Sequence, residues 1–231
     1  MTEAGGSRPV PRSIRVDLHN HTYYSPDSIL SPERLVSECR RRAIDVLAVT
    51  DHNTIRGALA VREVADFPLI IGEEIRSADG EIIGLFLRDE VPRGRPGAET
   101  VARVKEQGGL AGIPHPFDPR RLALRGEKLL EVIDQIDFIE ALNARIVFGA
   151  YNKRAAAFAD ERRIAKSAGS DAHSPGEVGR AWAEVRPFDG PADFLKALRE
   201  GRLAGTLSSP LVHLVSRYAA IRRRLGWRPP A

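Results

Sequence analysis

The stretch VDLHNHTYYSPDS, residues 16–28, closes a short apolar run with two histidines, His19 and His21, one residue apart. A carboxylate, Asp27, follows in the same stretch. At the end of an extended strand, residues i and i+2 point the same way, so the two imidazoles can bind one metal ion together. Such a site needs further ligands, and these must come from other parts of the chain.

Outward from this stretch, short apolar runs alternate with amphipathic segments. The apolar runs are strand-sized and cover residues 14–18, 45–50, 68–75, 81–87, 109–114, 137–142, 164–170 and 180–185. The amphipathic segments have helical periodicity and cover residues 31–43, 54–65, 98–108, 127–136, 151–163 and 190–201. Strand followed by helix, repeated along the chain, predicts an α/β fold with parallel strands covered by helices.

One pair of predicted strands is joined without a helix. The connector between residues 68–75 and 81–87 is RSADG, and its Asp-Gly pair is a turn signal. We therefore predict a β-hairpin here. A barrel built from this chain is then not a regular (β/α)8 barrel.

Length and composition favour one globular domain. The chain has 231 residues, 42% hydrophobic and 29% charged, which is enough to bury a full core without disulfides. Residues 1–12 carry Gly, Ser and Pro and are predicted to form a flexible leader. Residues 13–231 are predicted to form a single domain that ends with a helix at about residues 209–225.

Several features limit the cellular setting and the partners. The lone cysteine, Cys39, cannot form an internal disulfide, and we see neither a membrane span nor a secretory signal, so we expect a cytoplasmic protein. The formal net charge of +4 favours anionic partners such as phosphates or nucleic acid. We expect the dense basic runs at 39–43 and 221–228 to decorate solvated helix faces, so nucleic acid is not specifically indicated.

Five of the six histidines fall just beyond the ends of predicted strands, where α/β barrels place their active sites. They are His19, His21, His52, His115 and His173, whereas His213 lies in the C-terminal helix. Carboxylates occur at the same places: Asp27, Asp51, Glu73, Glu74 and Asp171. Imidazoles with carboxylates suit zinc, manganese or iron, and the absence of cysteine there favours a hydrolytic site over a structural zinc site.

These motifs together resemble those of the PHP (polymerase and histidinol phosphatase) family. The segments that carry the resemblance are DLHNHTYYSPDS (17–28), VTDHNTIRGA (49–58), IIGEEI (70–75), GIPHPFD (112–118) and GSDAHSPGEVG (169–179), in the family's order. His-x-His alone is weak, because amidohydrolases share it, but the full series is specific. The resemblance implies a distorted (β/α)7 barrel with a trinuclear metal centre holding two to three divalent ions.

The resemblance also implies which residues bind metal. The first ion would be held by His19, His21, Glu74 and Asp171. Glu74 would bridge to a second ion, which His115 also holds. The third ion would be held by Asp27, His52 and His173. Glu74 is chosen over Glu73 because the family pattern reads Gly-x-Glu at the strand end, and strand alternation points the two side chains apart.

The sequence departs from the family pattern at one ligand. Many members carry a histidine before the motif that reads hydrophobic-Gly-Leu, and this chain has Glu81 in DGEIIGLF (79–86). We expect Glu81 to bind the second ion and to favour manganese or iron over zinc. The alternative is that Glu81 is a turn residue and the second ion is weakly held.

The expected activity is metal-assisted hydrolysis of a phosphate ester, either a small phosphorylated metabolite or a nucleotide. Glu74, Asp171 and His173 are the predicted catalytic residues, with Asp171 placed to accept or relay a proton. Arg145 and Arg180 are candidates to hold the phosphate, and Asn143 is a candidate to orient the substrate. Tyr23 and Tyr24 could stack on a base or a sugar, or cap the mouth of the barrel.

Two other functions remain open. One is an amidohydrolase that cleaves a C–N bond, but many such enzymes use a carbamylated lysine, and Lys166 is too early in its strand to serve. The other is a non-catalytic, metal-bound accessory module like the PHP domains attached to replicative polymerases. The oligomeric state and the physiological substrate are not determined by the sequence.

Overall fold

The computed structural model describes residues 13–229, so the predicted leader at 1–12 lies outside the described residues. Nine strands form one sheet in the order β7-β6-β5-β4-β3-β2-β1-β8-β9. The strands are β1 (Ile14–Asp17), β2 (Val46–Val49), β3 (Leu69–Arg76), β4 (Glu81–Leu85), β5 (Leu110–Ile113), β6 (Phe138–Asn143), β7 (Ala165–Gly169), β8 (Ala181–Val185) and β9 (Arg202–Gly205).

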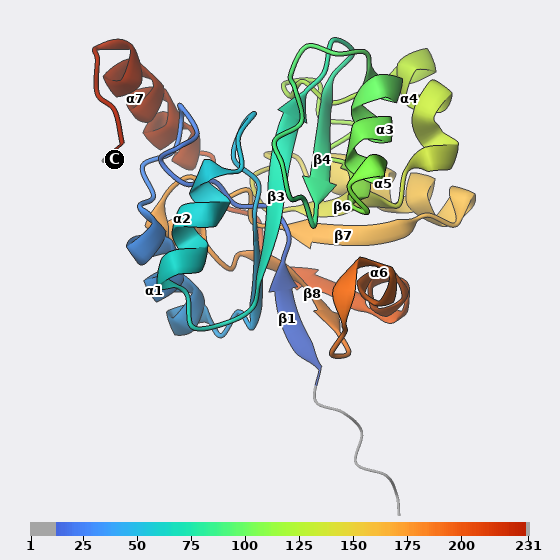
Figure 1. Ribbon diagram of the computed structural model, residues 1–231, viewed down its shortest axis with the longest axis horizontal. Helices are drawn as coiled ribbons and strands as arrows, with labels where there is room; N and C mark the ends of the chain where they lie inside the picture. The colour runs from blue at the N-terminus through green and yellow to red at the C-terminus, as the bar shows by residue number, and fades with distance from the viewer. Residues whose placement is uncertain (1–12, 230–231) are drawn as a thin grey trace, which may run out of the picture.

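Helices cover the outside of this sheet (Figure 1). They are α1 (Pro32–Arg42), α2 (Arg56–Val64), α3 (Gly97–Glu106), α4 (Gly126–Val132), α5 (Ala150–Arg162), α6 (Gly190–Glu200) and α7 (Val212–Arg224), with short 3-10 helices η1 (Ile133–Gln135) and η2 (Pro175–Glu177). In Figure 1, α1 and α2 lie on one side of the sheet, α3, α4 and α5 on the other, and α7 stands at the upper left. All six predicted interior helices are present within a few residues of their expected bounds.

The sheet curls so that β7, at one end of the strand order, comes to lie beside β1. The chain beyond β1 pairs with the chain at the end of β7: Leu18 N donates to Ala168 O at 3.1 Å, and Asp171 N donates to His19 O at 2.7 Å. A parallel bridge joins Asn20 to Ala172. The result is a nearly closed mixed α/β barrel, which confirms the predicted distorted barrel.

The predicted hairpin is confirmed. β3 and β4 are antiparallel, with Arg76 opposite Glu81. Gly80 has a positive φ of 149°, and a Cβ there would lie 2.5 Å from Leu124 N, so the turn requires glycine. Ser77 N donates to Gly80 O at 3.0 Å and closes the turn.

The expectation of parallel strands fails at three further strand pairs. β4 pairs antiparallel with β5, β8 with β1, and β9 with β8. The connection from β7 to β8 holds only η2, and a parallel pair needs a longer helical crossover, so the chain reverses direction instead. β9 was not predicted, because RLAG is a half-exposed strand at the sheet's edge with little apolar alternation.

The core leaves the histidine end of the barrel free for polar groups. One buried cluster joins the amino-terminal parts of several strands to α6, through Val16, Val46, Leu110, Phe138, Phe194 and Leu198. Two further clusters lie beneath α3, α4 and α5, and beneath α1 and α2. In the described part of the chain, no helix has the length and apolar character needed to cross a membrane.

Candidate metal centre

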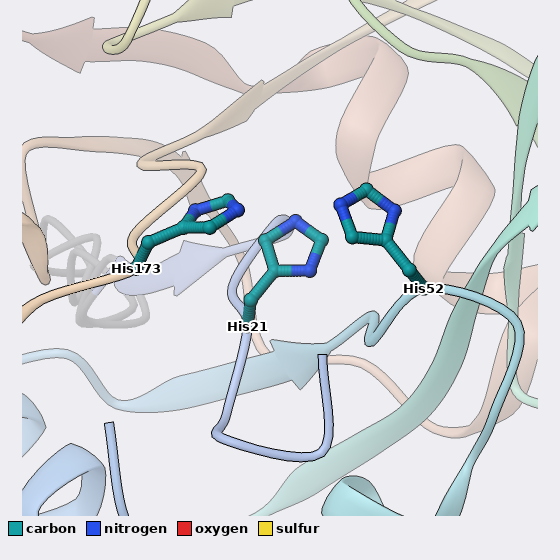
Figure 2. A group of neighbouring side chains, drawn as sticks. All are labelled: His21, His52 and His173. Carbon is teal, nitrogen blue, oxygen red and sulfur yellow. The ribbon is translucent and has the colours of Figure 1, made fainter. Parts of the chain in front are cut away.

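The five strand-end histidines converge at the carboxyl ends of the parallel strands. His19 and His21 follow β1, His52 follows β2, His115 follows β5 and His173 follows β7. Figure 2 shows the rings of His21, His52 and His173 facing one another from three separate segments of the chain. All but His52 are buried, so the imidazoles form a polar cluster inside the mouth of the barrel.

Glu74, near the end of β3, lies at the centre of these rings. Its Oε2 is 3.2 Å from Nε2 of His19, 3.3 Å from Nε2 of His21 and 3.2 Å from Nδ1 of His52. Its Oε1 is 3.1 Å from Nε2 of His115. One carboxylate therefore contacts four imidazoles, with its two oxygens turned to different sides.

Asp27 and Asp171 complete the cluster from two loops. Asp27 Oδ2 lies 3.3 Å from Nε2 of His173, and its Oδ1 lies 3.7 Å from Nε2 of His52. Asp171 Oδ1 lies 3.4 Å from Nε2 of His21 and 3.9 Å from Nε2 of His19. The loop that follows β1 and the loop that follows β7 thus supply carboxylates to the same cluster.

The donor atoms fit divalent metal ions. Three groups have ligand atoms within 4.8 Å of one another: His21 with His52 and His173, His19 with His21 and Glu74, and His52 with Glu74 and Glu81. Among the described residues, Asp27 Oδ1 and His173 Nε2 are buried without a hydrogen-bond partner. Buried polar atoms left without protein partners in a ring of imidazoles and carboxylates are what a bound cation would satisfy.

A second layer of polar groups orients the imidazoles. His19 Nδ1 donates to Glu140 Oε1 at 2.9 Å, so its Nε2 faces Glu74. His173 Nδ1 donates to the backbone oxygen of Asp171 at 2.8 Å, which turns its Nε2 toward Asp27. A carboxylate or carbonyl behind the distal ring nitrogen is the usual support of a metal-binding histidine.

Glu140 was not among the predicted site residues. It lies in β6, and its Oε2 accepts from His115 N at 2.9 Å and from Asn143 Nδ2 at 3.0 Å. Its carboxylate therefore positions two of the five histidines. The signal in the sequence was a single acidic residue inside an apolar strand, FIEALN, which alone does not tell a site residue from a solvent-facing one.

Mutual electrostatics shift the pKa values of the cluster in opposite directions. Burial, helped by the neighbouring His173 and His52, holds the pKa of His21 well below its ordinary value. Burial also lowers the pKa of His19, but the carboxylates of Glu140 and Glu74 outweigh it and raise that pKa. His21 is therefore a neutral imidazole with a free electron pair, the form that binds metal.

Burial raises the pKa values of Asp27 and Asp171, but interactions with neighbouring imidazole and guanidinium groups outweigh it. His173 and His52 hold the pKa of Asp27 well below its ordinary value. Arg121 and His19 do the same for the pKa of Asp171. Both groups are thus ionised across the neutral range, as metal ligands must be.

The backbone is strained where two of these residues sit. Asp171 has φ of 51° and His115 has φ of 30°, both in the left-handed region that residues other than glycine seldom adopt. Such conformations persist when the surrounding contacts hold them, and they concentrate at functional sites.

The structure separates the paired carboxylates of β3. Glu73 Oε2 accepts from Val91 N at 2.8 Å, whereas Glu74 points into the cluster. Glu81, at the start of β4, is buried, and its Oε2 lies 4.0 Å from Nε2 of His115. Glu81 therefore faces the cluster across the hairpin.

An arginine that was not predicted contacts the centre. Arg121 Nη2 lies 2.9 Å from Asp171 Oδ2. It lines a cavity of about 360 Å³ together with Asp27, His52, Glu74, Glu81 and His115. Arg121 lies in the irregular segment between β5 and α4, where the sequence has no periodic signal.

The three predicted substrate residues lie in different surroundings. Asn143 is buried and donates to Asp171 Oδ2 at 3.2 Å, which puts it beside the cluster. Arg145 is buried in an ion pair with Glu177 at 2.6 Å. Arg180 donates from Nε to Gly176 O at 3.2 Å. The cavity beside Glu74 is lined by neither Arg145 nor Arg180, so their role in holding phosphate stays a prediction.

Imidazole and carboxylate ligands gathered at the strand ends of an α/β barrel define a metal-dependent hydrolase. Comparison with known proteins agrees. The family model described as the PHP domain matches residues 17–139, and one described as PHP-associated matches residues 149–203. The chain belongs to the PHP domain family.

Individual relatives and solved structures are consistent with this family assignment. An uncharacterised protein of Methanocaldococcus jannaschii is 39% identical over 144 residues, which is 57% of this chain and 82% of that protein. A protein of Haemophilus influenzae named 5'-3' exoribonuclease is 31% identical over 129 residues, 49% of this chain and 46% of that protein.

Among solved structures, a two-domain protein from Bacteroides vulgatus is similar in fold. It is described as containing a "predicted PHP-like metal-dependent phosphoesterase". It superposes with a TM-score of 0.71 at 20% identity, over 89% of this chain and 70% of that one.

Proposed function

We propose that this protein hydrolyses phosphate esters at a centre of three divalent metal ions. The observation that carries the proposal is Glu74, a single carboxylate that contacts four imidazoles, with Arg121 on the wall of the same cavity. A bridging carboxylate suits a cluster of ions, and an arginine beside it suits an anionic substrate.

Each proposed ion has a group of neighbouring ligands. The first group is His19, His21, Glu74 and Asp171; the second is Glu74, Glu81 and His115; the third is Asp27, His52 and His173. The contacts of 3.1 to 4.0 Å among these side chains support the grouping. Bound divalent ions would activate a water molecule and withdraw charge from the phosphoryl oxygens.

The chain's own groups supply the remaining chemistry. The Arg121 guanidinium, paired with Asp171, stabilises negative charge on a phosphoryl group in the cavity. Asp171, a buried carboxylate next to Arg121, accepts or relays the proton of the attacking water. Glu74 and His173 act as catalytic residues because they would hold the metal ions beside the phosphoryl group.

The proposed substrate is a small phosphorylated metabolite or a nucleotide. Arg76 and Arg120 also line the cavity beside Glu74, which adds positive charge at its entrance. The relative named 5'-3' exoribonuclease adds support for a substrate with a nucleotide part. We further propose that residues 13–231 act as one PHP unit in the cytoplasm, and that the ions are zinc, manganese or iron.

The amidohydrolase alternative lacks its usual bridging group. Lys166 lies in β7 and pairs with Asp160 at 2.7 Å, and among the described residues no lysine lines the cavity beside Glu74. A buried, strained ligand cluster with an arginine also gives little support to a non-catalytic accessory module. The phosphoesterase proposal therefore explains more of the site.

The test compares reactions on one preparation of protein. Purified protein is assayed with an aryl phosphate and with amide substrates, each with added manganese, zinc or iron. Phosphate release that needs metal, and that disappears in His19→Ala/His21→Ala, is the expected result. Amide hydrolysis without phosphate release under any metal would support the amidohydrolase instead, and no hydrolysis at all would support the accessory module.

Two variants test the individual assignments. Arg121→Ala should lower kcat/KM for the aryl phosphate by roughly 10- to 100-fold, because it removes a charge-assisted hydrogen bond worth about 1.5–3 kcal/mol. Arg180→Ala is measured beside it, and the larger decrease identifies which arginine holds the phosphate.

Glu81→Gln should weaken binding of one ion per chain, while Glu81→His should restore it with a preference shifted toward zinc. Metal content after dialysis is the measurement. If Glu81→Gln retains as many ions as the unmodified protein, Glu81 is not a ligand.

A further inference from the structure

A second cavity, rich in arginine, adjoins the metal centre. Its volume is about 640 Å³, and five arginines from three parts of the chain line it: Arg56, Arg93, Arg223, Arg224 and Arg228. We propose that this arginine pocket binds a second phosphate group of the substrate, so that the preferred substrate carries at least two. The proposal rests on the phosphoesterase function proposed above.

The pocket and the metal centre share a wall. Pro26, His52 and Asn53 line both the arginine pocket and the cavity that contains Glu74. His52 itself lies 3.2 Å from Glu74 and 3.7 Å from Asp27. A ligand that spans this wall can place one phosphate at the metal ligands and another among the arginines.

No carboxylate of the described residues forms an ion pair with the arginines of the pocket. Among the described residues, none of the five arginines has a carboxylate oxygen within 4.0 Å, whereas some other surface arginines do, such as Arg40 with Asp66 and Arg186 with Asp193. Partial burial and the nearby Arg228 and Arg222 lower the pKa of Arg223. Like charges held together without counter-ions favour an anionic ligand.

Specific contacts hold two of the five arginines in place. Arg223 donates from Nη2 to Tyr23 O at 2.9 Å and to Tyr24 O at 3.2 Å, which joins the end of α7 to the loop after β1. Gly226, with φ of 101°, turns the chain so that Arg228 Nη1 donates back to Arg223 O at 3.1 Å. The guanidinium groups of Arg223 and Arg228 are therefore held in position at this pocket.

Aromatic side chains lie beside and behind the pocket. The Trp227 ring packs edge-on against Tyr23, with 5.9 Å between ring centroids. Arg56 lies over the Tyr24 ring at 5.2 Å, and Tyr24 also lines the pocket. An aromatic ring beside several guanidinium groups suits a ligand with a sugar or a base between its phosphates.

The pocket uses a part of the chain that the family comparison does not cover. α7 and the residues after it lie beyond the matched ranges 17–139 and 149–203. The shared chemistry is a second phosphate group, which either a nucleotide with two phosphates or a single-stranded oligonucleotide can supply. The experiment below separates the two.

The first measurement is binding without turnover. Labelled single-stranded oligonucleotide is titrated into the full-length His19→Ala/His21→Ala protein, with and without Arg223→Ala/Arg224→Ala/Arg228→Ala, over a range of salt. We expect the triple change to weaken binding at least tenfold and to reduce the salt slope by about 0.7 for each phosphate that the arginines no longer neutralise. Competition with a nucleoside bisphosphate and with a nucleoside monophosphate shows which ligand occupies the pocket.

The second measurement is catalysis in the otherwise unmodified protein. The triple change should raise KM at least tenfold for a substrate with two phosphates and leave kcat/KM for an aryl monophosphate within about twofold. Arg34→Ala/Arg40→Ala/Arg62→Ala, which removes the same charge from α1 and α2, should change neither. Arg93→Gln/Arg224→Gln removes only exposed side chains and should show the same selective effect if the triple variant folds poorly.

The outcomes distinguish the two proposals. Equal decreases for both substrates, or unchanged binding in the triple variant, would overturn the arginine pocket while leaving the phosphoesterase proposal intact. Arginine-dependent binding in a protein that releases no phosphate would overturn the phosphoesterase proposal and retain the pocket as an anion site. If neither nucleotide displaces the labelled oligonucleotide, nucleic acid is the source of the second phosphate; displacement by the bisphosphate but not by the monophosphate identifies a nucleotide.

Discussion

Glu140 orients the imidazole of His19, one of the proposed metal ligands. Both of its oxygens are used: Oε1 accepts from His19, and Oε2 accepts from His115 N and Asn143 Nδ2. Because Asn143 also donates to Asp171, the same network reaches a carboxylate that is a proposed metal ligand. A carboxylate outside the proposed ligand set therefore orients several groups that belong to it.

Glu140→Gln should weaken metal binding by about 10- to 100-fold, because the amide replaces one of two acceptor oxygens with a donor and releases the His19 ring. The affinity is measured by competition with a metal-binding dye. Glu73→Gln is a matched control. Glu73 is also a buried carboxylate, next to Glu74 in β3, but it accepts a hydrogen bond from the Val91 backbone and does not contact His19. Equal affinities in the Glu140 variant and the unmodified protein would show that Glu140 does not position His19.

A buried ion pair, Arg145 with Glu177, connects the helix α7 to the candidate metal centre. Arg145, just after β6, donates from Nε to Glu177 Oε2 at 2.6 Å, and from Nη2 to Ser216 Oγ of α7 at 2.6 Å. Glu177, in η2, also accepts from Ser174 Oγ at 2.6 Å. The pair thus connects β6, η2 and α7 next to His173.

Arg145→Met should lower the free energy of unfolding by roughly 3–5 kcal/mol, because it leaves the Glu177 carboxylate buried without its partner. Urea denaturation measures the change. Arg145→Met/Glu177→Gln removes the charge as well and should recover part of the stability. If Arg145→Met instead raises KM for a phosphomonoester without a decrease in stability, the sequence-based assignment of Arg145 to phosphate binding is supported.

The barrel as a whole closes at the candidate metal centre. Its proposed ligands come from the ends of β1, β2, β3, β5 and β7 and from the hairpin strand β4. The sheet's two halves also meet here, through Asp171 N and His19 O. Bound ions would therefore cross-link segments that are otherwise joined by few backbone hydrogen bonds.

Removal of metal should lower the melting temperature of the whole protein. An ion at 100 times its dissociation constant stabilises the folded state by about 2.7 kcal/mol, which corresponds to a shift on the order of 5–10 °C for a chain of this size. Thermal unfolding is compared after chelation and after metal is restored. His19→Ala/His21→Ala should show a much smaller shift, and a chelator effect of equal size in that variant would place the stabilising ion elsewhere.

The local sequence was enough to predict most of the elements and most of the proposed ligand set. His19, His21, His52, His115 and His173 could be found because each follows an apolar run, and the carboxyl ends of parallel strands meet at one end of a barrel. The Asp-Gly turn predicted the β3–β4 hairpin for a similarly local reason. Hydrophobic period and turn chemistry are properties of neighbouring residues, so they can be read from the chain itself.

The groups that surround the proposed ligands became visible only in the three-dimensional structure. Glu140 is one acidic residue in an apolar strand, Arg121 lies in an irregular segment, and β8 reverses its direction after a connection too short for a crossover. The arginine pocket brings Arg223 to Tyr23, which is 200 residues away in the chain. The basic run 221–228 was expected to decorate a solvated helix face; Arg224 and Arg228 are indeed exposed, and with Arg223 they also line a cavity beside His52. Contacts over such separations depend on how packed elements meet, and no local pattern in the sequence encodes that.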